Sequence, residues 1–71
     1  MKNINIEIGK RLKERRLKQG LSQEQFAERI GIHRTYVGSI ERGEKAITVK
    51  TLNKICKSLD TNLSEFLKNI S

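Results

Sequence analysis

The sequence contains no proline and no tryptophan, one cysteine and only three aromatic side chains. Without proline, and with many Lys, Arg, Glu, Gln and Leu residues, the chain favours helices joined by short turns. So few aromatic residues predict a modest, aliphatic core. This composition argues against a large enclosed active site.

The single cysteine, Cys56, excludes an internal disulfide. His33 is the only other soft metal ligand, which argues against a zinc site, and we expect no cofactor. Cys56 falls at a core spacing, which favours a buried, unreactive thiol over a redox sensor.

Long apolar runs are also missing. No stretch approaches the roughly 20 apolar residues that span a bilayer, and the first ten residues lack the apolar run of a signal peptide. We therefore expect a cytoplasmic protein, associated with the nucleoid.

Positive charge is abundant, with a formal net charge of +7 over 71 residues. A chain of this length has room for one domain. The charge predicts a polyanionic partner, nucleic acid first and an anionic membrane second, and charge alone does not separate the two.

Apolar spacing and capping residues predict an all-α domain. A capping box of Ser22 with Gln25 begins the second helix, and Gly20 and Gly31 end the first and second. His33, Thr48 and the Asn62–Glu65 pair precede later helices. The expected helices are residues 6–19, 22–30, 34–42, 48–59 and 63–70. Their inward residues are Ile8, Leu12, Leu17, Phe26, Ala27, Ile30, Leu52, Ile55, Cys56 and Leu59.

The second and third helices are separated only by residues 31–33, a short turn with a glycine that is typical of a helix-turn-helix. In such a unit the second helix places its N-terminal residues against base edges in the major groove. The spacing predicts one exposed polar face made of Arg34, Thr35 and Ser39.

The stretch LSQEQFAERIGIHRTYVGSIERGE at 21–44, followed by ITVKTLNKICKSLDTNLSEFL, resembles the Cro/CI-type helix-turn-helix regulators, or XRE family. The resemblance covers nearly the whole chain, from residue 8 to residue 67. It implies a compact five-helix, lambda-repressor-like DNA-binding domain over residues 1–71, with the helix-turn-helix at about 22–42. The narrower resemblance is to controller proteins of restriction-modification systems and to short phage-like repressors. His33, Gly38 and Cys56 depart from the family pattern.

The resemblance and side-chain chemistry together suggest site residues. The Arg34 guanidinium suits the O6 and N7 acceptors of guanine, and Thr35 and Ser39 can bond to base edges. By family analogy, Gln23 holds a phosphate and braces the recognition helix. Further candidates for phosphate contacts, which fix register without reading sequence, are Tyr36, Arg42, Lys45 and His33.

Other residues have competing interpretations. The basic residues of the first helix either extend the DNA footprint or form a solvated face; they are Arg11, Arg15, Arg16 and Lys18. Glu41 is expected to brace the fold through an ion pair, with an arginine as its partner. Gly38 is expected where another backbone, from DNA or a neighbouring helix, comes close.

The last helix, about residues 63–70, carries Leu63, Phe66, Leu67 and Ile70. Four large apolar groups exceed what so small a domain usually covers, so we expect a twofold dimer rather than completion of a monomer core. Such a dimer places two recognition helices about 34 Å apart, which predicts an inverted-repeat operator.

The sequence therefore predicts a homodimeric regulator that binds double-stranded DNA, is autoregulatory and takes no small-molecule ligand. Activation would need a contact with RNA polymerase, for which Glu41 and Glu44 are candidates. The alternatives are a short phage-type repressor, or an antitoxin or adaptor that acts mainly through protein contacts. Against an enzyme, the chain lacks paired acids and an activated nucleophile. Against RNA binding, the chain offers only Tyr36 as an exposed aromatic side chain for stacking on bases.

Overall fold

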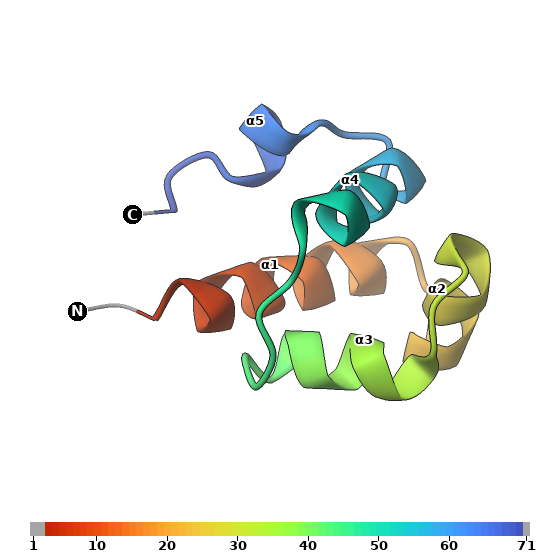
Figure 1. Ribbon diagram of the computed structural model, residues 1–71. Helices are drawn as coiled ribbons and strands as arrows, with labels where there is room; N and C mark the ends of the chain where they lie inside the picture. Colours follow the sequence, from red (N-terminus) through yellow and green to blue (C-terminus); the bar gives the residue numbers. More distant parts are fainter. Residues whose placement is uncertain (1–2, 71) are drawn as a thin grey trace.

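The computed structural model describes residues 3–70 as five short helices with no strand among them (Figure 1). The number and order of the helices confirm the prediction. None of the helices in the described chain is long and apolar enough to cross a membrane. The helices are α1 (Ile4–Lys18), α2 (Gln23–Ile30), α3 (Arg34–Glu41), α4 (Val49–Ser58) and α5 (Leu63–Phe66).

Helix α1 packs one face on the core through Ile8 and Leu12, as predicted. The prediction for Leu17 was wrong, because this side chain is 56% exposed whereas Arg16 is only 5% exposed. Residues four apart share a helix face, and Arg16 continues the row of Ile8 and Leu12. Leu17 lies about 100° further round the helix, outside that face.

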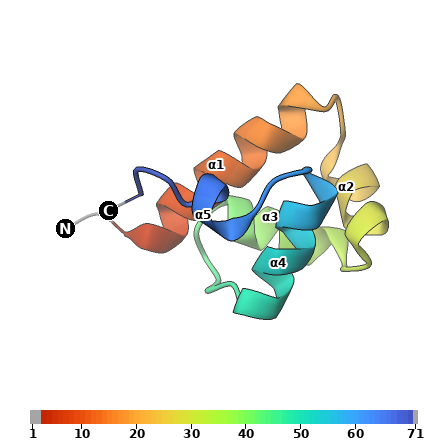
Figure 2. The same ribbon diagram turned by 90° about the horizontal axis from the view of Figure 1, so that it is seen from above.

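Helices α1 and α3 cross at Gly9. A Cβ atom on Gly9 would lie 2.3 Å from the carbonyl oxygen of Ile40 and 2.7 Å from that of Glu41. No residue with a side chain fits this contact without moving one of the helices. In Figures 1 and 2, α1 and α3 accordingly lie close together, and α2 packs on both α3 and α4.

Both ends of α2 and the turn that leads into α3 have the predicted capping residues. The Ser22 and Gln25 side chains form the reciprocal capping box at the start of α2. Gly31 ends α2 with φ at 75°, the left-handed region that glycine enters without strain. Ile32 packs partly on the core, and the His33 Nδ1 accepts a hydrogen bond of 3.0 Å from the Thr35 backbone N–H.

The core is aliphatic around two phenylalanines. Phe26 and Phe66 are fully buried, and Cys56 is buried as predicted. Burial raises the pKa of the Cys56 thiol, and the nearby Arg15 charge acts in the opposite direction. The other large side chains that are almost fully buried are Leu12, Val37, Ile40 and Ile55.

The last helix is shorter than expected. Helix α5 ends at Phe66 rather than near residue 70, and Asn69 turns the chain with a positive φ of 68°. Phe66 has no exposed surface, because the core of the same chain covers it. Its assignment to a dimer interface was therefore wrong. Three of the four predicted interface residues remain partly exposed: Leu63, Leu67 and Ile70.

Candidate nucleic-acid interface

The first turn of α3 is exposed and its second half is covered. His33, Arg34 and Thr35 are exposed, whereas Val37 and Ile40 are buried. The helix thus offers its polar N-terminal end to solvent while its apolar face holds it on α1 and α2. This is the arrangement that a recognition helix needs for contact with base edges.

Ser39 does not share the exposed face, and that expectation was wrong. It is 8% exposed, and its hydroxyl donates a hydrogen bond of 3.1 Å to the Thr35 carbonyl. Other parts of the domain cover the second half of α3, so residues 37–41 are all buried whatever their polarity. Arg34 and Thr35 are left as the exposed candidates for base contacts.

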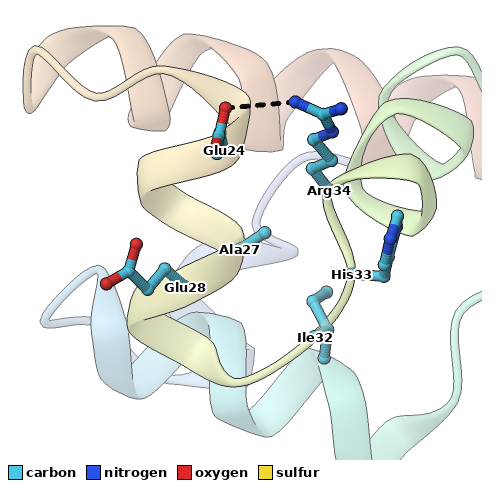
Figure 3. A pocket seen from close by; sticks show the side chains of 6 residues that line it. All are labelled: Glu24, Ala27, Glu28, Ile32, His33 and Arg34. Atoms are coloured by element: carbon cyan, nitrogen blue, oxygen red, sulfur yellow. Dashed lines mark hydrogen bonds and ion pairs between the residues drawn. The ribbon is translucent and has the colours of Figure 1, made fainter.

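A hollow of about 410 Å³ lies between α2 and the start of α3 (Figure 3). Across its mouth the Arg34 Nη1 lies 3.1 Å from a Glu24 carboxylate oxygen, with the two side chains 64% and 70% exposed. Exposed pairs of this kind contribute about 0–1 kcal/mol, so the Arg34 guanidinium can exchange this partner for a base. Glu24 was not among the site residues predicted from the sequence. The lining residues are Glu24, Ala27, Glu28, Ile32, His33 and Arg34.

A buried ion pair joins α1 to the end of α3. The Arg16 Nε and Nη2 donate to the two Glu41 carboxylate oxygens at 2.7 and 3.0 Å. This confirms Glu41 as an ion-pairing brace. The hydrogen bond to Glu41 raises the pKa of Arg16. Arg16 is therefore unavailable as part of a DNA footprint and Glu41 is unavailable for RNA polymerase, which corrects both hypotheses.

Gln23 is connected to the same pair. Its Nε2 donates a hydrogen bond of 3.0 Å to the Glu41 Oε1, which already accepts from Arg16. A side-chain amide has two N–H donors, so one remains for another acceptor. The first residue of α2 is in this way positioned by the brace that holds α1 against α3.

Arg42, at the end of α3, lies outside the core and pairs with Glu44. Its Nε and Nη2 donate to the two Glu44 oxygens at 2.8 and 3.1 Å. These hydrogen bonds lower the pKa of Glu44 and raise that of Arg42. Lys45 beside them is exposed, and Tyr36 is partly buried against the core.

Gly38 has different neighbours from those expected. Within this chain the nearest atoms to a Cβ on Gly38 belong to the side chains of Arg42 and Gln23, not to a backbone. The neighbouring-helix alternative predicted for Gly38 was therefore wrong, and such a close approach occurs at Gly9, where the carbonyls of α3 come close. The alternative of a DNA backbone close to Gly38 stays a prediction.

Two of the four basic residues proposed to extend the footprint along α1 serve the fold of the C-terminal segment. The Arg11 Nη1 donates to the carbonyl oxygens of Phe66, at 3.0 Å, and Lys68. The Arg15 guanidinium carbon lies 6.0 Å from the centre of the Phe66 ring, within the range of a cation–π contact. Lys18 is the one of the four that is exposed.

Comparisons with known proteins agree with this geometry. A family model described as Helix-turn-helix matches residues 12–66. Control protein C.MunI from Mycoplasma sp is 42% identical over 71 residues, covering 99% of this chain and 96% of that protein. Control protein C.SmaI from Serratia marcescens is 51% identical over 47 residues, or 66% of this chain and 56% of that protein.

A solved structure extends the likeness to three dimensions. The restriction-modification controller protein C.Esp1396I, determined as a tetramer in complex with its natural 35 base-pair operator, matches with a TM-score of 0.83 and 29% identity. The match covers 96% of this chain and 90% of that one. The chain belongs to the helix-turn-helix family, and within it to the controller proteins of restriction-modification systems, which are DNA-binding transcriptional regulators rather than enzymes.

Proposed function

We propose that this protein is a homodimeric, sequence-specific regulator that binds an inverted-repeat operator and controls its own expression within a restriction-modification system. The observation that carries the proposal is the exposed start of α3, where Arg34 and Thr35 project from a helix whose other face is buried. Such a helix end can enter the major groove, which is about 12 Å wide.

Arg34 is the main base reader in this proposal. Its ion pair with Glu24 is exposed, and a bidentate contact from arginine to guanine discriminates against other bases by about 1–3 kcal/mol. Thr35 adds a hydroxyl and a methyl group, which suit a base edge and the thymine methyl.

Phosphate contacts surround this reading end. Gln23 keeps one amide N–H free of Glu41. The His33 Nδ1 accepts from the Thr35 backbone, so a neutral His33 carries its proton on Nε2, where it can donate to a phosphate oxygen. Three further side chains complete the proposed contacts: Tyr36, Arg42 and Lys45.

The dimer uses the C-terminal segment. Leu63, Leu67 and Ile70 are partly exposed around the buried Phe66, and a second copy of the chain would cover them. The C.Esp1396I tetramer on its operator supports assembly of this kind on DNA. Two recognition helices about 34 Å apart would then read half-sites one duplex turn apart.

In this proposal the protein takes no small-molecule ligand. Its regulatory output therefore depends on its own concentration, which sets how much of the operator is occupied. The protein would be cytoplasmic and would bind its operator within the nucleoid. A contact with RNA polymerase during activation is also proposed. Glu44 is exposed and is the remaining acidic candidate on this surface for that contact, because Glu41 is buried.

Selection of bound duplexes from a random pool tests the proposal. We expect the recovered sites to share an inverted repeat with a guanine at the same place in each half-site. Recovery without any common sequence would contradict sequence-specific regulation and favour the alternative of an adaptor that acts mainly through protein contacts.

A further inference from the structure

Gly38 lies in the middle of α3 and is buried although it has no side chain of its own. A Cβ atom at this position would lie 3.0 Å from the Arg42 Nη1 and 3.5 Å from the Gln23 Oε1. Its backbone is not among the positive-φ glycines of the described chain, so the helix itself does not require glycine there. Alanine would favour the helix more, which leaves the space above Gly38 as the reason for glycine.

The Arg42 guanidinium is oriented over this space. Glu44 accepts from Nε and Nη2, which uses two of the five N–H donors of arginine. Three donors remain, and two of them are on Nη1, the nitrogen nearest to Gly38. Glu44 thus holds one edge of Arg42 while the other edge keeps its donors.

Gln23 reaches the same place from the start of α2. Its Nε2 donates to Glu41, its second N–H is unused, and its Oε1 is within van der Waals reach of a Cβ on Gly38. The guanidinium donors of Arg42, from the end of α3, and the amide group of Gln23, from the beginning of α2, therefore lie over one glycine, with the Gln23 Oε1 as the amide atom nearest to it. Without a side chain at residue 38, they can approach each other.

We propose that Gln23, Gly38 and Arg42 form one composite phosphate-binding site, the Gly38 notch, in which Gly38 supplies space rather than a contact. A single phosphate group has several acceptor oxygens and can take hydrogen bonds from the Gln23 amide and the Arg42 guanidinium together. Gly38 is a positioning residue here. The inference rests on the proposed DNA binding and specifies how that surface holds the backbone.

Substitution Gly38→Ala separates this role from fold stability. Asn53→Ala is the matched control, because Asn53 is an exposed residue of α4 where alanine also favours the helix. We expect the thermal midpoint to hold or rise in both variants, and Asn53→Ala to bind DNA like the unchanged protein. Gly38→Ala should lose about threefold to tenfold in affinity for operator and random duplexes alike, with the salt slope reduced by about one per subunit.

A double-mutant cycle with Arg42→Ala tests the coupling between the two residues. If Arg42 binds phosphate through the notch, Gly38→Ala should cause little further loss once the guanidinium is gone. An equal loss in both backgrounds would overturn the proposal, as would unchanged binding by Gly38→Ala, a lowered thermal midpoint, or a loss confined to one base position. Failure of the unchanged protein to bind any duplex would instead refute the proposed function.

Discussion

Arg16 of α1 and Glu41 of α3 are 25 residues apart in the sequence and form two hydrogen bonds with each other in the interior of the domain. Arg16 also donates to the Leu21 carbonyl at 2.7 Å, at the start of the segment that leads into α2. One arginine therefore ties α1 to the end of α3 and to the entry of α2. The orientation of the recognition helix depends on this pair.

Replacement of either partner alone should destabilise the fold strongly. Arg16→Met leaves the Glu41 carboxylate buried without its arginine partner, and Glu41→Leu leaves the Arg16 guanidinium buried without its carboxylate partner. Loss of one partner of a buried pair costs about 3–5 kcal/mol. Urea unfolding monitored by circular dichroism measures the free energy of unfolding. The double replacement should be less destabilising than the sum of the two single ones, and single losses below about 1 kcal/mol would show that the pair is not a brace.

Glu24→Gln should release Arg34 with little effect on the fold. The pair is exposed, so the free energy of unfolding should change by less than about 1 kcal/mol. Removal of a negative charge beside the reading surface should strengthen binding to all duplexes at low salt. Fluorescence anisotropy titrations measure this effect, with Glu65→Gln, an exposed acid in α5, as the control. Weaker binding by Glu24→Gln alone would mean that Glu24 positions Arg34 for DNA.

Charge at the C-terminal segment should separate dimerisation from folding. Ile70→Lys places a charge at the partly exposed edge and should give folded monomers in sedimentation experiments. Phe66→Lys should unfold the chain, because Phe66 has no exposed surface. If Ile70→Lys still formed folded dimers, the interface would have to lie at other exposed apolar residues, such as Ile4 or Val49.

Cys56 gives a pH-dependent prediction. Its folded-state pKa is raised, mainly by burial, so the folded state favours the neutral thiol. Stability linked to Cys56 should be fully present below the unfolded-state pKa of about 8.5 and should fall as pH rises above that value, since the unfolded chain then releases the proton more readily. Cys56→Ala should lack this component in urea unfolding between pH 7 and about 10. An identical pH profile would exclude the thiol as its source.

The sequence was sufficient for features that depend on neighbouring residues. The Ser22 capping box, the Gly31 turn and the apolar row of α4 are set by side chains within a few positions of one another. The brace role of Glu41 followed from the absence of any partner for catalysis. Its partner could not be identified from spacing alone, since Arg16 is 25 residues away.

The misassignments share a physical origin in contacts between distant elements. Ser39 is buried because the rest of the domain covers the second half of α3, and Phe66 is buried by the core of its own chain. The burial of Arg16 could have been predicted from the sequence, because Arg16 continues the four-residue spacing of Ile8 and Leu12. The close contact at Gly9 left no such signal, because it depends on how two helices cross.

The most direct test compares Arg34→Ala with Arg29→Ala, two exposed arginines whose replacement removes the same charge. Arg29 lies in the last turn of α2 and is bonded to Gln19 rather than to the reading end of α3. The measurement is the ratio of operator affinity to random-duplex affinity at fixed salt. We expect Arg34→Ala to reduce this ratio by a factor equivalent to about 1–3 kcal/mol per half-site and Arg29→Ala to leave it unchanged. Equal ratios for Arg34→Ala and the unchanged protein would contradict base reading by the start of α3.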